Sequence, residues 1–108
     1  NMTISIQDFS QIDLRVAVIT AAEEHPDADK LLVLKVDAGD GEKQLVAGIK
    51  THYSVEELVG KKIIVVNNLT PAVLRGVESN GMLLAARDGD DVVLVTTDKD
   101  VGPGSRVQ

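Results

Sequence analysis

The chain divides into short runs of β-branched and aliphatic residues separated by clusters of glycine, proline, asparagine and aspartate, and this pattern limits the fold more than any other feature. Such runs predict strands, and the clusters of turn-forming residues predict the connections between them. In the second run, Leu32, Leu34 and Val36 alternate with other residues and should lie on the core side. We expect strands over residues 14–22, 30–37, 44–49, 62–67, 82–86 and 92–96, with a final strand that includes Arg106 and Val107.

A short helical turn is expected before the first strand. Ser5 is followed three residues later by Asp8, which is the spacing of a helix N-terminus. Ile6, Phe9 and Ile12 would share the inner face of this turn, so we expect Phe9 to belong to the core.

A second short helix is expected between the third and fourth strands. Ser54 and Glu57 have the spacing of a capping box, Leu58 follows, and Gly60 ends the segment. A five-stranded barrel with one short helix between strands 3 and 4 is the oligonucleotide/oligosaccharide-binding (OB) layout. We therefore predict an all-β fold, a five-stranded OB-fold barrel with extra C-terminal strands, as a single domain over residues 1–108. Periodicity alone supports a small barrel or a sandwich.

The charge is unevenly distributed along the chain. The net charge of −6 argues against a nucleic-acid partner at first sight. Residues 43–87, however, contain six basic and three acidic groups, a balance of +3, while the remainder contains five basic and fourteen acidic groups, a balance of −9. The central segment is therefore mildly basic, and the total is set by acidic loops elsewhere.

Composition excludes several classes of protein. The absence of cysteine rules out disulfides and thiolate metal sites and is typical of a reducing compartment. No run approaches the roughly 20 apolar residues of a membrane helix. The first residues lack the basic and apolar regions of a secretory signal. We therefore expect a cytoplasmic protein with no membrane association.

Catalytic patterns are weak. The segment from Gly76 to Gly81 reads G-x-x-S-x-G, one residue too long for a nucleophile elbow, and it precedes a strand rather than a helix. His25 and His52 lie 27 positions apart with no acidic partner at a recognisable spacing, so we expect both to be surface or loop histidines. We predict a non-catalytic domain that needs no cofactor and no metal.

A binding role is better supported. Two adjacent strands need only a short turn, so the long polar connection over residues 68–81 is typical of a contact loop. An arginine can fork onto a phosphate, lysines supply point charges, and amides or hydroxyls supply hydrogen bonds. The candidates of these kinds are Arg75, Lys30, Lys50, Asn68 and Ser79.

Base stacking on aromatic residues is nearly excluded. Phe9 and Tyr53 are the only aromatic residues, and Phe9 is expected in the core. Recognition of a nucleic acid would then depend on shape, phosphate contacts and polar hydrogen bonds.

Three motifs resemble the tRNA-binding domain found at the C-terminus of methionyl-tRNA synthetases and in free-standing dimeric tRNA-binding proteins. They follow the family patterns H-P-x-A-D-K-L, E-E-L-x-G-K and N-L-x-P-x-x-L-R-G-x-x-S-x-G-M-x-L-A-A. The matching positions are His25, Pro26, Ala28, Asp29, Lys30, Leu31, Glu56, Glu57, Leu58, Gly60, Lys61, Asn68, Leu69, Pro71, Leu74, Arg75, Gly76, Ser79, Gly81, Met82, Leu84, Ala85 and Ala86.

The resemblance implies a function and a set of contacts. It implies structure-specific tRNA binding through the barrel face that bears Lys30, Asn68, Arg75, Ser79 and Met82. It also implies a homodimer that extends the tRNA-binding platform, and possible association with a methionyl-tRNA synthetase catalytic domain or subunit. Apart from the family, Met82 would be read as a core residue that opens an apolar strand.

Some alternatives remain open from the sequence. Relatives often carry lysines where this chain has Thr70 and Val73, which implies a weaker tRNA affinity. The domain could be a free-standing protein or synthetase β-subunit, towards which Met2 as an apparent start points, or a part of a methionyl-tRNA synthetase. A peptide-binding, chaperone-like module of the same fold is the alternative from another class.

Overall fold

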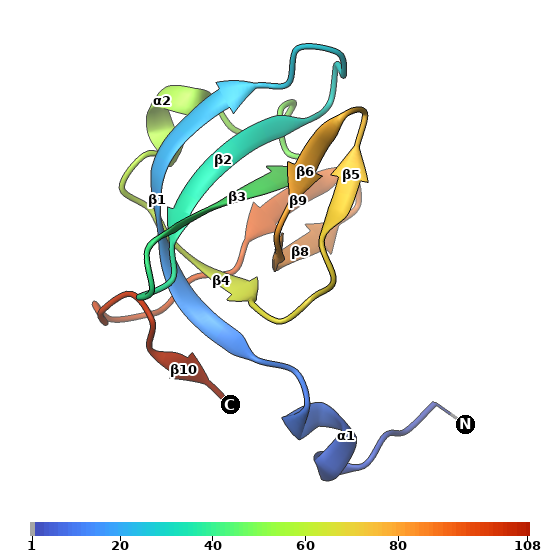
Figure 1. Ribbon diagram of the computed structural model, residues 1–108, viewed down its shortest axis with the longest axis vertical. Coiled ribbons are helices and arrows are strands. Elements are labelled where there is room, and N and C mark those ends of the chain that lie inside the picture. The colour runs from blue at the N-terminus through green and yellow to red at the C-terminus, as the bar shows by residue number, and fades with distance from the viewer. Residues whose placement is uncertain (1) are drawn as a thin grey trace.

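The computed structural model describes residues 2–108, which form a curled antiparallel sheet with a small helix at one end (Figure 1). Neither helix of the described residues is long and apolar enough to cross a membrane. The elements in chain order are α1 (Ile6–Ser10), β1 (Leu14–Glu24), β2 (Leu32–Asp37), β3 (Glu42–Ala47), α2 (Val55–Leu58), β4 (Lys62–Val66), β5 (Ala72–Leu74), β6 (Val77–Ser79), β7 (Met82–Leu83), β8 (Ala85–Asp88), β9 (Asp91–Leu94) and β10 (Arg106–Val107).

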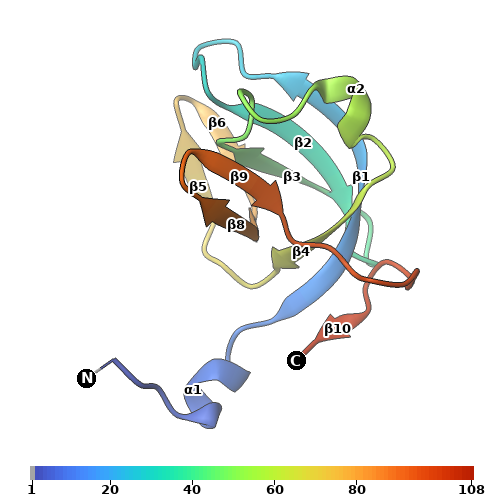
Figure 2. The same ribbon diagram turned by 180° about the vertical axis from the view of Figure 1, so that it is seen from behind.

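The main sheet has the strand order β3-β2-β1-β4-β7, and β10 pairs with the beginning of β1. All of its pairs are antiparallel, and the long strand β1 has β2 and β4 as neighbours. A register shift between Ile19 and Ala21 interrupts the β1–β2 ladder, and such bulges bend a strand and increase its twist. The bent β1 curls the sheet into a half-barrel, seen from both sides in Figures 1 and 2. This agrees with the predicted OB-like all-β fold.

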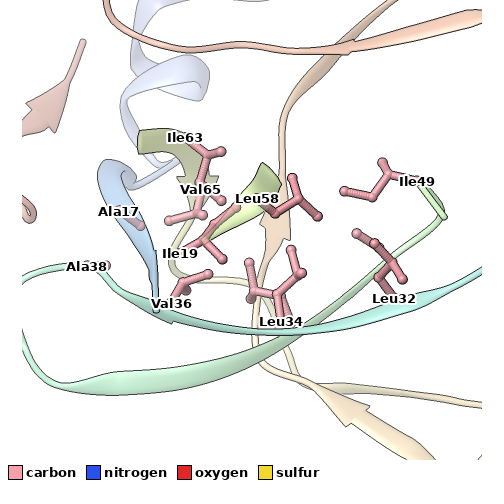
Figure 3. Close-up of a cluster of buried hydrophobic side chains, with 12 residues drawn as sticks. Ala17, Ile19, Leu32, Leu34, Val36, Ala38, Ile49, Leu58, Ile63 and Val65 are labelled. Carbon is pink, nitrogen blue, oxygen red and sulfur yellow. The ribbon is translucent and has the colours of Figure 1, made fainter. Parts of the chain in front are cut away.

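The core fills the concave side of this sheet (Figure 3). Leu32, Leu34 and Val36 are almost completely buried, as their alternation predicts. Leu58 of α2 is fully buried and points into the same cluster, so the helix closes one end of the half-barrel. Burial of a leucine of this kind stabilises the fold by about 1.5–3 kcal/mol. A second, smaller cluster involves Leu14 of β1 on the other side of the sheet.

The predicted helix between the third and fourth strands is confirmed. The Ser54 side chain accepts a hydrogen bond from the Glu57 backbone N–H at 3.2 Å, and the Glu57 carboxylate accepts one from the Ser54 backbone N–H at 2.8 Å. This reciprocal capping box begins α2. Gly60, with φ of +92°, then turns the chain into β4.

Helix α1 forms as predicted, but it does not pack against the core as predicted. The Ser5 hydroxyl accepts a hydrogen bond from the Asp8 backbone N–H at 3.0 Å. No residue of this helix is buried, and Phe9 is 37% exposed, so its assignment to the core is wrong. The physical reason is that α1 lies outside the half-barrel, beside β10 (Figures 1 and 2), where residues 106–108 border its apolar face and the core does not.

The segment expected as a polar connection over residues 68–81 is instead largely a β-hairpin, made of β5 and β6. A second hairpin, β8–β9, matches the predicted pairing of the last two long runs. The expected strand at residues 82–86 is divided, because β7 pairs with β4 while β8 pairs with β9. Leu84, between them, donates its backbone N–H to Ile64 O at 2.9 Å.

Candidate nucleic-acid interface

The β5–β6 hairpin turns at Arg75 and Gly76. Their φ angles are +53° and +86°, and two successive positive values are those of a type I′ turn, which matches the twist of a hairpin. Among the described residues, Arg75 is the only non-glycine residue with a positive φ. This conformation costs an ordinary side chain about 1–2 kcal/mol, so the backbone is strained at the position where the guanidinium is presented.

The hairpin is fixed to strand β3 by polar contacts. Gln44 donates its side-chain amide to Glu78 O at 2.8 Å, and Asn80 donates its backbone N–H to Gln44 O at 2.8 Å. The Ser79 hydroxyl accepts from Val46 N–H at 3.0 Å and donates to Gly81 O at 3.0 Å. These bonds hold the hairpin over the open edge of β3 and leave its tip projecting.

The tip of the hairpin meets the loop between β1 and β2, residues 25–31. Arg75 donates from Nη2 to Asp27 O at 3.0 Å, and His25 Nε2 lies 2.9 Å from Leu74 O. An open groove of about 610 Å³ lies between the loop and the tip. It is lined by Pro26, Asp27, Ala28, Asp29, Lys30, Leu31 and Arg75.

Two of the predicted contact residues therefore line one groove, and a third is bonded to one of them through its backbone. Lys30 and Arg75 line it, and Lys50 is joined to Lys30 by a hydrogen bond from its backbone N–H to Lys30 O at 3.3 Å. The charge of the Lys50 ammonium is partly balanced by Glu24, at 3.4 Å. Asp27 and Asp29 also line the groove, so its charge is mixed, which favours moderate rather than strong attraction for a polyanion.

Asn68 lies elsewhere and is already bonded. Its Oδ1 accepts from Asp13 N–H at 2.9 Å, and its Nδ2 donates to Gln11 O at 2.7 Å. The side chain thereby ties the end of β4 to the segment that leads from α1 into β1. Asn68 remains exposed, but both of its polar atoms serve the fold.

Ser79 is buried, with 4% of its surface exposed, and its hydroxyl is occupied by the two bonds described above. Its geometry gives it a role in the attachment of the hairpin to β3 and leaves no free group for an outside ligand. Met82 is different, because it is 50% exposed at the start of β7. The interpretation of Met82 as a core residue is therefore wrong.

Other basic residues of the central segment are engaged in the fold. Lys43 donates to Asn67 Oδ1 at 2.5 Å, and Lys62 forms an ion pair with Asp100 at 2.5 Å. The Tyr53 hydroxyl accepts from Leu94 N–H at 3.0 Å, and its ring packs against the core. Neither aromatic residue lies on the groove, in agreement with recognition that does not depend on stacking.

The burial of His25 could not be expected from the sequence. His25 lies in a loop, as a surface or loop histidine should, but only 4% of it is exposed. Its burial depends on Leu74, 49 positions away, and no local pattern could have revealed it; position in the H-P-x-A-D-K-L motif was the only signal. His52, by contrast, is exposed as expected.

A polar hollow of about 470 Å³ lies near the opposite end of β1, and Asp13 and Arg15 line it. Arg15 Nε donates to Asp13 Oδ1 at 2.7 Å. Burial would raise the pKa of Asp13, but the hydrogen bond and charge of Arg15, helped by Asn67 and Arg106, hold that pKa below its ordinary value. No group of three metal-ligating side chains occurs among residues 2–108.

Comparison with known proteins decides the family. Residues 14–106 match the family described as "Putative tRNA binding domain". The chain belongs to this tRNA-binding domain family. The match includes both parts of the groove, the loop 25–31 and the β5–β6 hairpin. The family is one of binding domains, in line with the prediction of a non-catalytic domain.

Relatives of known sequence are methionine–tRNA ligases. The chain is 54% identical to the methionine–tRNA ligase of Thermotoga maritima over 104 residues, which are 96% of this chain and 16% of the ligase. It is 56% identical to the methionine–tRNA ligase of Methanococcus aeolicus, over 96% of this chain and 15% of the ligase. The chain thus spans about a sixth of the length of these relatives.

Solved structures include two kinds of protein. A "MetRS related protein" from Pyrococcus horikoshii superposes with a TM-score of 0.93 at 37% identity and covers 100% of both chains. The CsaA chaperone protein from Picrophilus torridus superposes with a TM-score of 0.91, also at 37% identity, over 98% of this chain and 100% of the other. The tRNA-binding domain therefore shares its fold with proteins named for either role.

Proposed function

We propose that this tRNA-binding domain binds tRNA in a structure-specific manner through the groove between loop 25–31 and the tip of the β5–β6 hairpin. The observation that carries the proposal is that a member of this family brings Arg75 and Lys30 together on one open groove. Arg75 supplies a fork for a phosphate, and Lys30 and Lys50 supply point charges. No aromatic side chain is among the residues that line the groove, which supports binding to shape and backbone rather than to one anticodon.

The tRNA-binding domain would act beside a catalytic domain or subunit of a methionine–tRNA ligase, because its relatives are ligases of which it spans about a sixth. Amino-acid activation would belong to the remainder of such an enzyme. The mixed charge of the groove suits an accessory role, in which the domain raises the local concentration of tRNA for a partner. A cytoplasmic location follows from this role.

A homodimer is part of the proposal. Met2, Ile4 and Ile6 are each at least 67% exposed, and Phe9 and Ile12 are 37% and 38% exposed. These side chains form an apolar surface on and around α1, next to β10, that a second copy of the chain could cover. Two copies would present two grooves to one tRNA.

Charge reversal tests the groove. Filter binding of labelled tRNA at two or more salt concentrations should show log affinity falling with log salt at a slope of roughly −2 to −3 per subunit. Arg75→Glu should weaken binding and flatten this slope, because it removes a released counterion and adds a repulsive charge. Asp90→Lys, in the turn of the β8–β9 hairpin, changes charge by two units as well but should alter affinity little. Equal effects of both substitutions would contradict the assignment.

A peptide-binding, chaperone-like role is the second candidate. It is favoured by the CsaA structures and by exposed apolar side chains on the hairpin segment, namely Leu69, Val73, Leu74 and Met82. Titration with tRNA and with an unfolded polypeptide at two salt concentrations separates the two. Binding to tRNA that weakens with salt supports the first role, whereas polypeptide binding that is insensitive to salt, without tRNA binding at low salt, supports the second.

A further inference from the structure

The contacts of His25 extend the proposed function, on which this inference rests. We infer that His25 is the positioning residue of the groove. Its side chain touches no tRNA but fixes the position of the Arg75 guanidinium relative to the loop 25–31. Without it, the hairpin tip and the loop would be two separately mobile segments.

The imidazole of His25 bridges two segments. Its Nδ1 accepts a hydrogen bond from the Asp27 backbone N–H at 2.9 Å, so this nitrogen carries no proton. The neutral ring therefore has its proton on Nε2, which lies 2.9 Å from Leu74 O and donates to it. One ring thus bonds its own loop with one nitrogen and the last residue of β5 with the other.

The same residue of the loop also receives Arg75. While the Asp27 N–H donates to His25, the Asp27 carbonyl accepts from Arg75 Nη2 at 3.0 Å. The His25 backbone N–H closes the loop by donating to Leu31 O at 3.2 Å. The guanidinium is therefore bonded to a residue, Asp27, whose backbone N–H His25 holds in place.

Burial makes the hydrogen bonds of this side chain costly to lose. His25 is 4% exposed, so both nitrogens must be bonded within the protein, because water is not available to replace a lost partner. The hairpin tip has few other restraints on this side, since Arg75 and Gly76 are exposed and its attachments to β3 lie at the far end of β6. Loss of the imidazole should free the tip without opening the core.

A pair of isosteres tests the two bonds separately. His25→Gln keeps an amide N–H that reaches the former place of Nε2, so it should retain the bond to Leu74 O and bind tRNA within about twofold of the natural protein. His25→Asn is as polar but too short for that bond and should weaken tRNA binding by about five- to tenfold, as should His25→Ala, comparable to the loss of one phosphate contact. His52→Ala, at the exposed histidine, is the control and should leave affinity unchanged.

A double-mutant cycle separates positioning from general destabilisation. If His25 acts through Arg75, then combining His25→Ala with Arg75→Ala should weaken binding no more than Arg75→Ala alone, and both singles should flatten the salt slope. Independent effects that multiply to about 25- to 100-fold would overturn the inference. Amide NMR spectra of each variant should show the core signals unchanged; loss of the core signals would also overturn it.

The two hydrogen bonds of the His25 ring can also be tested without tRNA. Nitrogen-15 NMR of the histidine rings should find His25 with its proton on Nε2, protected from exchange, and His52 freely exchanging. A His25 ring protonated on Nδ1 would overturn the inference. Absence of tRNA binding by the natural protein at low salt would overturn the proposed function, and with it the positioning role, whereas normal binding by both His25→Asn and His25→Ala would overturn the inference alone.

Discussion

At the scale of single residues, polar side chains in this tRNA-binding domain divide between those that build the fold and those that remain available to a ligand. The Ser79 hydroxyl and the Asn68 amide are hydrogen-bonded to backbone groups. Arg75 donates one hydrogen bond to Asp27 O, and the rest of its side chain remains exposed. Position in a motif therefore does not distinguish a contact residue from a supporting one, but the partners of its polar atoms do.

The strained backbone at Arg75 predicts a difference between two truncations. Arg75→Ala and Arg75→Gly both remove the guanidinium, so both should weaken tRNA binding to the same extent. Only glycine relieves the positive φ, so Arg75→Gly should be more stable to unfolding than Arg75→Ala by about 1 kcal/mol. Urea unfolding and tRNA filter binding measure the two effects; equal stabilities would show that the turn relaxes in the absence of the side chain.

The lowered pKa of Asp13 predicts a stability effect that depends on pH. A carboxyl whose pKa is lower in the folded state stabilises the fold above its unfolded pKa, and this stabilisation is lost as the pH falls through the folded value. Asp13→Asn should therefore be less stable than the natural protein at pH 7, and the difference should shrink at about pH 3 and below. Urea unfolding at both pH values checks this, and a difference that stays constant would contradict it.

At the scale of elements, the sequence predicts the strands and the helix that carry a local sequence signal. Strands β1 and β2 were expected from apolar residues that alternate with other residues, β3 from the cluster of turn residues before it, and α2 from its capping box. The β5–β6 hairpin was missed because its first strand is wholly exposed and so carries no such period. Its turn, Arg75-Gly76, also differs from the Asn-Gly and Asp-Gly pairs that are typical of a type I′ turn.

The candidate site was predicted in part. Lys30 and Arg75 were recognised as cations and line one groove, whereas Lys50 is connected to Lys30 only through a backbone hydrogen bond. The contacts of His25 and Ser79 depend on residues 49 and 33 positions away, which no local pattern encodes. Long-range hydrogen bonds of this kind follow from the three-dimensional arrangement of strands and become visible only there.

Close approach between elements predicts the effect of a methyl group at Gly81. A Cβ there would lie 3.0 Å from Val66 O and 3.1 Å from Leu45 Cδ2, so Gly81→Ala should push β7 away from β4 and β3 and destabilise the fold by about 1–3 kcal/mol. Gly41→Ala is the matched control, since Gly41 also has a positive φ, of +99°, but nothing lies within 4 Å of its added methyl. Thermal or urea unfolding of both variants makes the comparison, and equal stabilities would refute the close-packing argument.

At the scale of the whole molecule, the apolar surface around α1 lies apart from the groove. The groove lies where loop 25–31 meets the β5–β6 hairpin, and α1 lies near the other end of the half-barrel (Figure 1). An apolar surface at one end can be covered by a second copy while the groove at the other remains open. This separation is what a dimeric platform for one large ligand requires.

The dimer is tested through α1. The natural protein should sediment at about twice its chain mass of 11.5 kDa at micromolar concentration. Phe9→Glu should shift it to the monomer and weaken tRNA binding through the loss of the second groove, because it places a charge in the apolar surface. Val93→Glu, at an exposed position of β9, is the control and should leave the mass unchanged. A mass near 11.5 kDa for the natural protein would rule out the dimer.

Strand β10 has a consequence for synthesis. It pairs with Leu14 and Arg15, whereas β2 pairs with β1 only from Val18 onward, so the last strand completes an edge that the first strand leaves open. That pairing joins positions 14 and 107, and contacts so distant along a chain form late. During translation, part of the edge of β1 therefore stays unpaired until residue 107 has left the ribosome. A nascent chain stalled before that point should be captured by chaperones more readily than one stalled well after it.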